Sequence, residues 1–225
     1  MNDHPQHSES SVHNFYSRLH TAFGPSAQGL GWGTKGLQVH RFEALSRVWD
    51  FRDRTVLDVG CGICDLYEYL IPKGLNRYIG IDFVEAYCRY ARGRFSGSSI
   101  EIIHRDLYSS QPLPSCDIAL VSGTFNVMNS ESEDENYSAI ESVMGRLKVA
   151  CNIGFSINFL SDATTFRDRT LFYANSEKVL SIARGVSRRL LISHFEFPFE
   201  YTLHVWCDDT YEPSNSLYHS LWPHR

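Results

Sequence analysis

The stretch that decides the fold reads Val56-Leu57-Asp58-Val59-Gly60-Cys61-Gly62-Ile63-Cys64-Asp65-Leu66. A hydrophobic segment passes into glycines and then into helix-forming residues, which predicts a strand, a tight turn and a helix. Glycine is needed where a strand turns sharply into a helix and a ligand approaches the backbone. In open α/β sheets ligands bind at the carboxyl ends of the strands, where this loop is expected. A purely structural turn has the same pattern, so other residues must decide.

Strand-like and helix-like segments alternate around this stretch. Strands are expected at Thr55–Gly60, Tyr78–Asp82, Ile100–Asp106, Cys116–Gly123 and Cys151–Leu160, and helices at Val12–Phe23, Leu37–Asp50, Cys64–Leu70, Val84–Phe95, Glu133–Val149 and Ser176–Ser187. Such alternation implies β-α-β units around a parallel sheet. The last two strands, Arg189–Phe197 and Tyr201–Trp206, are too close in sequence for a parallel crossover, so they form a hairpin. The predicted fold is α/β, a doubly wound, Rossmann-like, seven-stranded and mostly parallel sheet with a C-terminal antiparallel hairpin.

The length of 225 residues suits one such domain with appendages. We expect a disordered tail over 1–11, an N-terminal helical cap over 12–50, a Rossmann-like ligand-binding domain over 51–206 and a surface tail over 207–225. The stretch Gly24–Gly36 carries five glycines and is expected to form a loop.

Two carboxylates follow the next two strands along the chain. Asp82 ends its strand about twenty residues past the glycine loop. At this place a carboxylate can accept hydrogen bonds from both hydroxyls of a ribose. Asp106 ends the following strand, where it is placed to accept a hydrogen bond from the exocyclic amine of adenine. Either residue alone could be a helix N-cap or a turn residue. Together with the loop, the two acids predict a pocket for an adenosine.

The charge of the pocket separates the adenosine cofactors. A dinucleotide fold requires Gly-x-Gly-x-x-Gly, and the position three past Gly62 is Asp65. Asp58, two residues before the first glycine, suits a cationic ligand and repels a pyrophosphate. S-adenosylmethionine has a sulfonium, an ammonium and no phosphate, so it is favoured over NAD. An NAD-dependent oxidoreductase remains an alternative.

The run from Thr55 to Trp206 resembles the class I S-adenosylmethionine-dependent methyltransferases. The family's acidic residue and glycine loop match Asp58, Gly60, Cys61 and Gly62, with Cys64 in place of the third glycine. The resemblance implies that Asp82 binds the ribose, with Phe83 beside the adenine, and that Asp106 and Leu107 lie at the adenine edge. The closing hairpin fits the family's antiparallel seventh strand. The implied cofactor is S-adenosyl-L-methionine and the implied activity is direct, in-line methyl transfer.

A narrower resemblance links the chain to a group of small bacterial methyltransferases. It consists of Gly31-Trp32-Gly33-Thr34-Lys35 with Gln38, Arg41 and Phe42, then Ser122-Gly123-Thr124-Phe125-Asn126, and Asn158-Phe159-Leu160-Ser161. It implies a donor site capped by N-terminal helices, to which Gln38, Arg41 and Ser122 contribute. An arginine at position 41 could pair with the donor's carboxylate or form a surface salt bridge.

Three residues are candidates for the acceptor side. Asn126 follows the fourth strand, where it either binds an acceptor or forms a turn. His194 on the hairpin is a possible general base because imidazole takes a proton near neutral pH. Tyr173, in the loop after the fifth strand, is a comparable candidate. Each of the three has an alternative structural role.

Composition excludes several classes. The formal net charge is −5, which disfavours binding to a phosphate backbone, and the sequence has no stretch suited to span a bilayer. The polar N-terminus does not read as a signal peptide, so we expect a cytoplasmic protein acting on a small molecule. Cys61 and Cys64 have the spacing of a redox pair or half a zinc site, but no second pair accompanies them, so we predict no metal. A methyltransferase-like subunit without activity is a further alternative, and the oligomeric state is left open.

Overall fold

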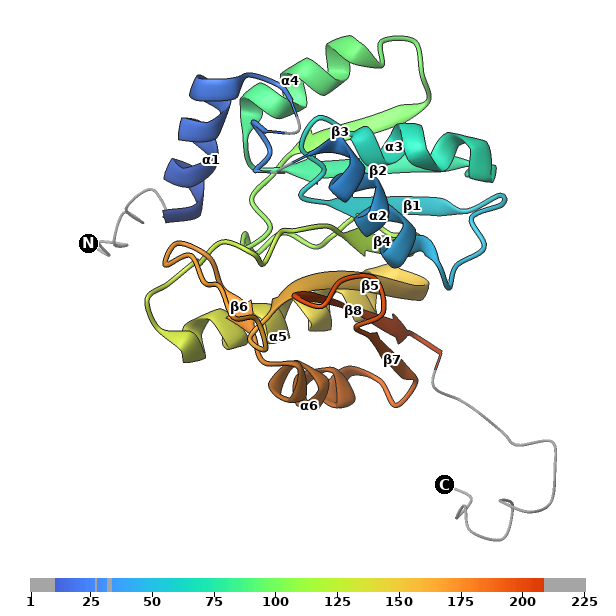
Figure 1. Cartoon of the computed structure of the whole chain (residues 1–225). Coiled ribbons are helices and arrows are strands. Elements are labelled where there is room, and N and C mark those ends of the chain that lie inside the picture. Colours follow the sequence, from blue (N-terminus) through green and yellow to red (C-terminus); the bar gives the residue numbers. More distant parts are fainter. Residues whose placement is uncertain (1–10, 27, 32–33, 209–225) are drawn as a thin grey trace, which may run out of the picture.

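The computed structural model describes residues 11–26, 28–31 and 34–208. One sheet runs through the molecule in the order β3-β2-β1-β4-β5-β8-β7 (Figure 1). Pairing is parallel from β3 to β5 and antiparallel between β5 and β8 and between β8 and β7. The strands are β1 Thr55–Val59, β2 Arg77–Asp82, β3 Ile100–His104, β4 Cys116–Val121, β5 Cys151–Ser161, β6 Tyr173–Ala174, β7 Leu190–Ser193 and β8 Glu200–Trp206. The Rossmann-like fold with a C-terminal antiparallel hairpin is confirmed.

The sheet differs from the prediction at several places, among them β7, which ends at Ser193 and not at Phe197. An eighth strand, β6, pairs in parallel with the end of β5, inside a segment expected to be a loop. A strand of two residues is too short to show the alternation of hydrophobic and polar residues that predicts a strand. β3 ends at His104, two residues earlier than predicted, because Asp106 turns back to accept a hydrogen bond from the Tyr108 amide at 2.8 Å.

Helices cover both faces of the sheet (Figure 1). They are α1 Ser11–Phe23, α2 Lys35–Ser46, α3 Asp65–Leu70, α4 Glu85–Arg94, α5 Glu133–Ala150 and α6 Ser176–Val186, with a short 3₁₀ helix, η1, at Ile71–Lys73. Helices α2, α3 and α4 pack on one face, where Phe42 meets Val56 and Leu120 in one buried cluster. Because strand side chains alternate between faces, Leu57 and Val59 belong to the opposite cluster.

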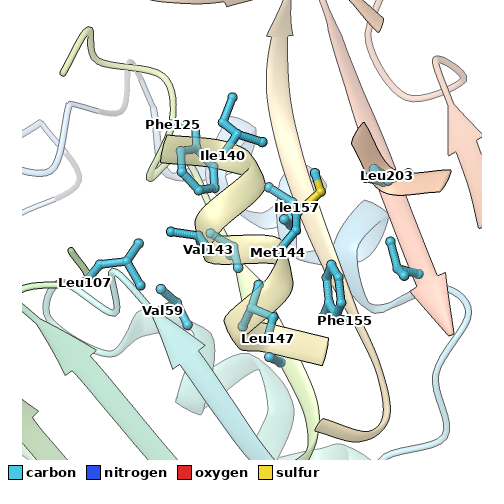
Figure 2. Packing of buried hydrophobic residues seen from close by; sticks show 14 of the residues in the cluster. Val59, Leu107, Phe125, Ile140, Val143, Met144, Leu147, Phe155, Ile157 and Leu203 are labelled. Atoms are coloured by element: carbon cyan, nitrogen blue, oxygen red, sulfur yellow. The ribbon is translucent and has the colours of Figure 1, made fainter. Parts of the chain in front are cut away.

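The second core lies between the sheet and α5. Val143, Met144 and Leu147 of α5 pack on Phe155 and Ile157 of β5 (Figure 2). Helix α5 begins with three acidic residues, Glu133, Asp134 and Glu135, which favour the helix N-terminus. The Ser132 hydroxyl caps this helix by accepting from the Glu135 amide. No helix within the described ranges is both long and apolar enough to cross a membrane.

The N-terminal region divides into two parts. Helix α2 contributes Phe42, Leu45 and other residues to the core, so it is a layer of the domain. Helix α1 instead lies beside the ends of the central strands and packs through Tyr16 on Phe83 and Tyr87 (Figure 1). The tail expected over 1–11 lies outside the described residues except for Ser11, as do positions 209–225 of the C-terminal tail.

Candidate active site

A cavity of about 870 Å³, its open mouth included, lies at the carboxyl ends of β1, β2 and β4. Helices α1 and α2 close two of its sides. Its lining includes every cofactor-site residue that the sequence predicts except Arg41. The lining residues are Val12, Tyr16, Leu30, Gln38, Phe42, Asp58, Gly60, Cys61, Gly62, Asp65, Leu66, Ile81, Asp82, Phe83, Val84, Tyr87, Arg105, Asp106, Leu107, Tyr108, Ser122 and Thr124.

The glycine loop follows β1 and is fixed by its neighbour β2. The amides of Gly60 and Cys61 both donate to the Ile81 carbonyl, at 2.8 and 3.0 Å. Gly60 has a φ of +76°, and a Cβ built there would lie 2.5 Å from the Thr124 hydroxyl. The turn therefore needs glycine at position 60 for its backbone angle and for space.

Cys64 occupies the left-handed conformation that glycine usually adopts. Its φ is +62°, and it directly precedes α3. The loop thus keeps a glycine-like path although the third glycine of the family pattern is absent. A non-glycine residue in this conformation costs about 1–2 kcal/mol, which the buried surroundings of Cys64 must offset.

The two loop cysteines pack against β2. A Cβ at Gly80 would lie 2.8 Å from the sulfur of Cys61 and 3.4 Å from that of Cys64, so the two sulfurs fill the space above this glycine. The hydrogen bond from Cys64 and then burial raise the pKa of the Cys61 thiol well above its usual range. These contacts give the pair a packing role and keep Cys61 protonated.

Asp58 brings a buried carboxylate to the floor of the cavity. Its Oδ2 accepts a short hydrogen bond from the Tyr78 hydroxyl, while its Oδ1 has no partner among the described residues. Burial raises the pKa of Asp58 to about 7, and the Tyr78 hydrogen bond partly opposes this rise. A cation beside Oδ1 would stabilise the ionised form.

Asp82 links the glycine loop to the start of α4. Its Oδ2 accepts from the Gly62 amide and its Oδ1 from the Val84 amide, each at 2.8 Å. Burial raises the pKa of Asp82 to about 6, against the lowering effect of these amides. Each carboxylate oxygen has a second lone pair, so Asp82 retains the capacity to accept from two hydroxyl groups.

The far end of the cavity is apolar with one acid at its edge. Phe83, Val84, Tyr87 and Leu107 line this part, and Asp106 lies exposed at the rim. The Tyr87 hydroxyl donates to the carbonyls of Gly29 and Tyr16, which holds the N-terminal segment over the cavity. Such a flat apolar site with an acceptor at its edge suits an adenine ring.

Gln38 and Ser122 add polar atoms at the opposite end. The Gln38 amide nitrogen donates to Asp65 Oδ2 at 3.2 Å, and Arg94 binds the other oxygen of Asp65 at 2.6 Å. This contact fixes the amide, and Gln38 Oε1 has no partner in the described part of the chain. The same is true of Ser122 Oγ.

Arg41, for which the sequence leaves open a contact with the donor's carboxylate or a salt bridge, does not line the cavity. It is buried on another side of α2 and forms an ion pair with Glu200, in which Nε donates to Oε2 at 2.6 Å and a terminal nitrogen donates to Oε1. Arg41 and Gln38 are three residues apart and leave α2 in neighbouring directions, but Arg41 reaches Glu200 whereas Gln38 reaches the cavity. The sequence could not reveal a partner so distant along the chain.

The three acceptor-side candidates are not brought together. Asn126 is buried after β4, its carbonyl accepts from the Phe172 amide at 2.9 Å, and its side-chain Oδ1 has no partner within the described ranges. Tyr173 lies on β6, where its hydroxyl accepts from the Asp168 amide. His194 is exposed just after β7, with its ring 5.0 Å from that of Tyr201. None of them lines the cavity.

Sequence reasoning missed the residues that close the cavity from the N-terminal side. Val12, Tyr16 and Leu30 lie on it although they precede the sheet by many residues. An aromatic residue on a short helix carries no signal of where that helix docks. Thr124 belongs to the predicted segment Ser122–Asn126, and its hydroxyl leaves no room for a side chain at position 60.

Comparisons with known proteins show the family to which the chain belongs. Residues 56–146 match the family model of the methyltransferase domain. The protein Rv1506c of Mycobacterium tuberculosis (strain ATCC 25618 / H37Rv), whose name describes it as a methyltransferase, is 31% identical over 157 residues, which cover 67% of this chain and 92% of that protein. The chain belongs to the methyltransferase family.

Solved structures share the fold at low sequence identity. Magnesium protoporphyrin IX methyltransferase from Synechocystis PCC 6803, with bound S-adenosylmethionine, has a TM-score of 0.60 and 14% identity, covering 91% of this chain and 99% of that one. The N-methyltransferase NodS from Bradyrhizobium japonicum WM9, in complex with S-adenosyl-L-homocysteine, has a TM-score of 0.62 and 15% identity, covering 86% and 98%. The predicted methyltransferase family and its fold are confirmed, and the oxidoreductase alternative is set aside.

Proposed function

We propose that this enzyme transfers the methyl group of S-adenosylmethionine to a small-molecule acceptor in one in-line step. The observation that carries the proposal is a set of three buried polar atoms without partners among the described residues, Gln38 Oε1, Asp58 Oδ1 and Ser122 Oγ, all from residues that line one cavity. A buried polar group without a hydrogen bond costs about 1–3 kcal/mol. A ligand that donates to these atoms removes this cost when it binds.

The chemistry of the three atoms fits the amino-acid end of the donor. A glutamine oxygen and a carboxylate oxygen only accept hydrogen bonds, and a serine hydroxyl can accept or donate. An ammonium group carries three N–H donors and a positive charge, which Asp58 favours electrostatically. The pyrophosphate of a dinucleotide would instead meet the acidic side chains of Asp58, Asp65 and Asp82.

The rest of the donor has a place along the cavity. We assign the two ribose hydroxyls to Asp82, whose carboxylate is fixed by two amides. The adenine ring would lie among Phe83, Val84 and Leu107, with its amine directed to Asp106 at the rim. Gly60 and Gly62 have no side chains, so the loop backbone at these two positions can lie close to the ligand.

When bound, the donor supplies a methyl group already activated by the sulfonium charge. The protein's task is then to align the acceptor and to exclude water. Helix α1 covers the cavity through Val12 and Tyr16, and the Tyr87 hydroxyl ties the following segment in place. Asn126 is our candidate for holding the acceptor. Its buried Oδ1 has no partner among the described residues, and it lies two positions along the chain from Thr124, which lines the cavity. Tyr173 and His194 stay candidates for a proton acceptor if the substrate enters protonated.

A small acceptor is supported by charge. The chain has a formal net charge of −5, and binding to a nucleic acid backbone needs clustered positive charge. Two of the similar solved structures are named for methyl transfer to a porphyrin and for N-methylation. The atom that receives the methyl group here is open, and a screen must find it.

Isothermal calorimetry tests the cofactor part of the proposal. S-adenosylmethionine and S-adenosylhomocysteine should bind with a Kd near the micromolar range, and NAD should not bind. Asp82→Ala should weaken binding roughly 100-fold, because two hydrogen bonds to a charged group are lost. Gln38→Met keeps the side-chain length and should weaken binding about 10-fold. Glu101→Ala, an exposed change on β3, is the control and should bind as the wild type does.

The transfer itself needs a second assay. Release of S-adenosylhomocysteine is measured against a panel of small metabolites that carry hydroxyl, amine, thiol and activated carbon nucleophiles. Turnover with one of them, lost in Asp82→Ala, supports the enzyme. Tight donor binding with no turnover on any member, together with stable capture of one protein, would favour the non-catalytic alternative.

A further inference from the structure

Three cysteines meet at the edge of the sheet opposite the cavity. Cys116 begins β4 and Cys151 begins β5, and the two are directly paired in the register of these parallel strands. Their sulfurs are 3.5 Å apart. Cys207 follows β8, and its amide donates to the Ile153 carbonyl at 2.8 Å, which brings it beside the start of β5.

The three thiols form a continuous row with Cys151 in the centre. The Cys151 thiol is in hydrogen-bond contact with that of Cys116, and it also influences the Cys207 thiol. Cys116 and Cys151 are buried, whereas Cys207 is partly exposed. An oxidant in solution therefore meets Cys207 first and has a second thiol directly behind it.

The surroundings of Cys207 favour a reactive thiolate. The side chain of Lys148 reaches over from α5 and donates to the Cys207 carbonyl. The hydrogen bond from Cys151 and the charge of Lys148 lower the pKa of Cys207 against the effect of burial, whereas the neighbouring thiols and then burial raise the pKa of Cys151. Thiolate character with access to solvent is what distinguishes oxidation-sensitive cysteines from inert buried ones.

We propose that Cys207 and Cys151 form a reversible disulfide when the protein meets a hydroperoxide, with Cys207 as the thiol that is oxidised first. The Cys207 thiolate attacks the peroxide oxygen, which breaks the O–O bond and gives a sulfenic acid and an alkoxide. The alkoxide takes up one proton from solvent, equal to the one that the thiol released on ionising, and leaves as an alcohol, or as water when the oxidant is hydrogen peroxide. Cys151 then attacks the sulfenic sulfur, and the hydroxyl group leaves with the Cys151 proton as water. Two thiols are oxidised and one peroxide is reduced.

Motion within the row is small enough for this step. A disulfide needs the two sulfurs about 2.0 Å apart, an approach that rotation of the two side chains can supply when their backbones are neighbours. Cys151 begins β5 and Cys207 directly follows β8, the antiparallel neighbour of β5, and the Cys207 amide is bonded to Ile153 two residues from Cys151. Cys61 and Cys64 are also adjacent, but both are buried and the pKa of Cys61 is raised, so they should oxidise later.

Mass spectrometry of the full chain tests the proposal. Reduced protein is treated with one equivalent of hydrogen peroxide, blocked with N-ethylmaleimide, and digested without reductant. We expect one linked peptide pair that contains Cys151 and Cys207, an intact mass lower by two hydrogen atoms, and return of both thiols after treatment with dithiothreitol. A first disulfide between Cys61 and Cys64, or no thiol loss at Cys207, would overturn the proposal.

Single variants separate the roles of the two thiols. Cys207→Ser should prevent formation of the linked pair, and Cys151→Ser should leave a sulfenic acid at position 207 that dimedone labels. Cys88→Ser removes a buried thiol outside the row and should oxidise as the wild type does. Lys148→Gln should slow the loss of the Cys207 thiol several-fold, and Lys148→Arg should retain most of the rate. Equal rates for Lys148→Gln and the wild type would remove the assigned role of this charge.

Discussion

Arg41 of α2 and Glu200 at the start of β8 are 159 residues apart in sequence and form an ion pair with two hydrogen bonds inside the protein. Glu200 also accepts from the Asn158 side chain at 3.4 Å, and Asn158 in turn accepts from the Gly123 amide at 2.7 Å. Gly123 lies between Ser122 and Thr124, which line the cavity. The pair therefore connects the helix that carries Gln38 with the turn that follows β4.

Breaking this pair should destabilise the fold strongly. Glu200→Met leaves the Arg41 charge buried and short of its carboxylate partner, so the free energy of unfolding should fall by about 3–5 kcal/mol. The double variant Arg41→Met, Glu200→Met removes both charges and should recover most of that loss. Urea denaturation of the two single variants and the double variant gives the coupling energy.

The matched control is the exposed pair of Arg52 and Asp50, where both side chains are more than half accessible. Arg52→Met should leave stability within experimental error of the wild type, because exposed pairs contribute little. Equal losses for Arg52→Met and Glu200→Met, or additive losses in the double variant, would contradict the role of the buried pair.

The fold and most of the predicted residues that line the cavity follow from the sequence because they depend on local patterns. A strand that passes through Asp58 into Gly60 and Gly62 has one structural solution, and Asp82 lies at the end of the next parallel strand. Arg41 is different, because helical spacing predicts on which side of α2 its side chain lies but cannot predict that Glu200 is its partner. Tyr16 and β6 are similar cases, because their positions depend on how distant segments dock.

Asp58 should give the folded protein a stability that decreases as pH rises. Its folded pKa of about 7 lies above its ordinary value of 3.8, so the folded state holds a proton that the unfolded state releases. The resulting stabilisation is present below pH 4 and is lost as pH rises through 7. Relative to Asp58→Asn, the wild type should therefore lose roughly 2–4 kcal/mol between pH 4 and 8.

Urea midpoints measured for both proteins across this range check the Asp58 prediction. Asparagine keeps an oxygen that accepts from Tyr78, which makes the variant a fair reference for the uncharged state. Asp50→Asn, at an exposed carboxylate, serves as the control and should follow the wild-type profile above pH 4. A constant difference between wild type and Asp58→Asn at all pH values would contradict the raised pKa.

The glycine loop should tolerate glycine at position 64 and reject a side chain at position 60. Cys64→Gly removes the left-handed strain and one buried thiol, so the affinity for S-adenosylhomocysteine should stay within about threefold of the wild type. Gly60→Ala places a methyl group 2.5 Å from the Thr124 hydroxyl at a φ of +76°, and should lose about 1–3 kcal/mol of stability and most of the binding.

A double variant distinguishes the two causes at Gly60. Thr124→Ala removes the hydroxyl that a new side chain would strike, and leaves the backbone angle unchanged. The pair Gly60→Ala, Thr124→Ala should regain part of the lost stability in thermal unfolding, and the remainder reports the cost of the positive φ. Complete failure of Cys64→Gly to bind the ligand would show that the thiol has a role beyond packing.

His204 should make the protein sensitive to acid, with the opposite sign to Asp58. The Trp49 indole donates to the Ser156 hydroxyl at 2.6 Å, which leaves the Ser156 proton to donate to His204 Nδ1 at 2.7 Å. Burial and then the charge of Arg47 lower the pKa of His204 to about 4, so the folded state keeps the ring neutral. The stability that this provides is present above pH 6.5 and is lost as pH falls through 4, by roughly 2–3 kcal/mol.

His204→Asn retains an acceptor near Nδ1 and should therefore lose less stability than the wild type when urea denaturation is compared between pH 7 and 4. His40→Asn, at an exposed ring, should keep the wild-type slope, and an unchanged slope in His204→Asn would assign acid sensitivity to other groups.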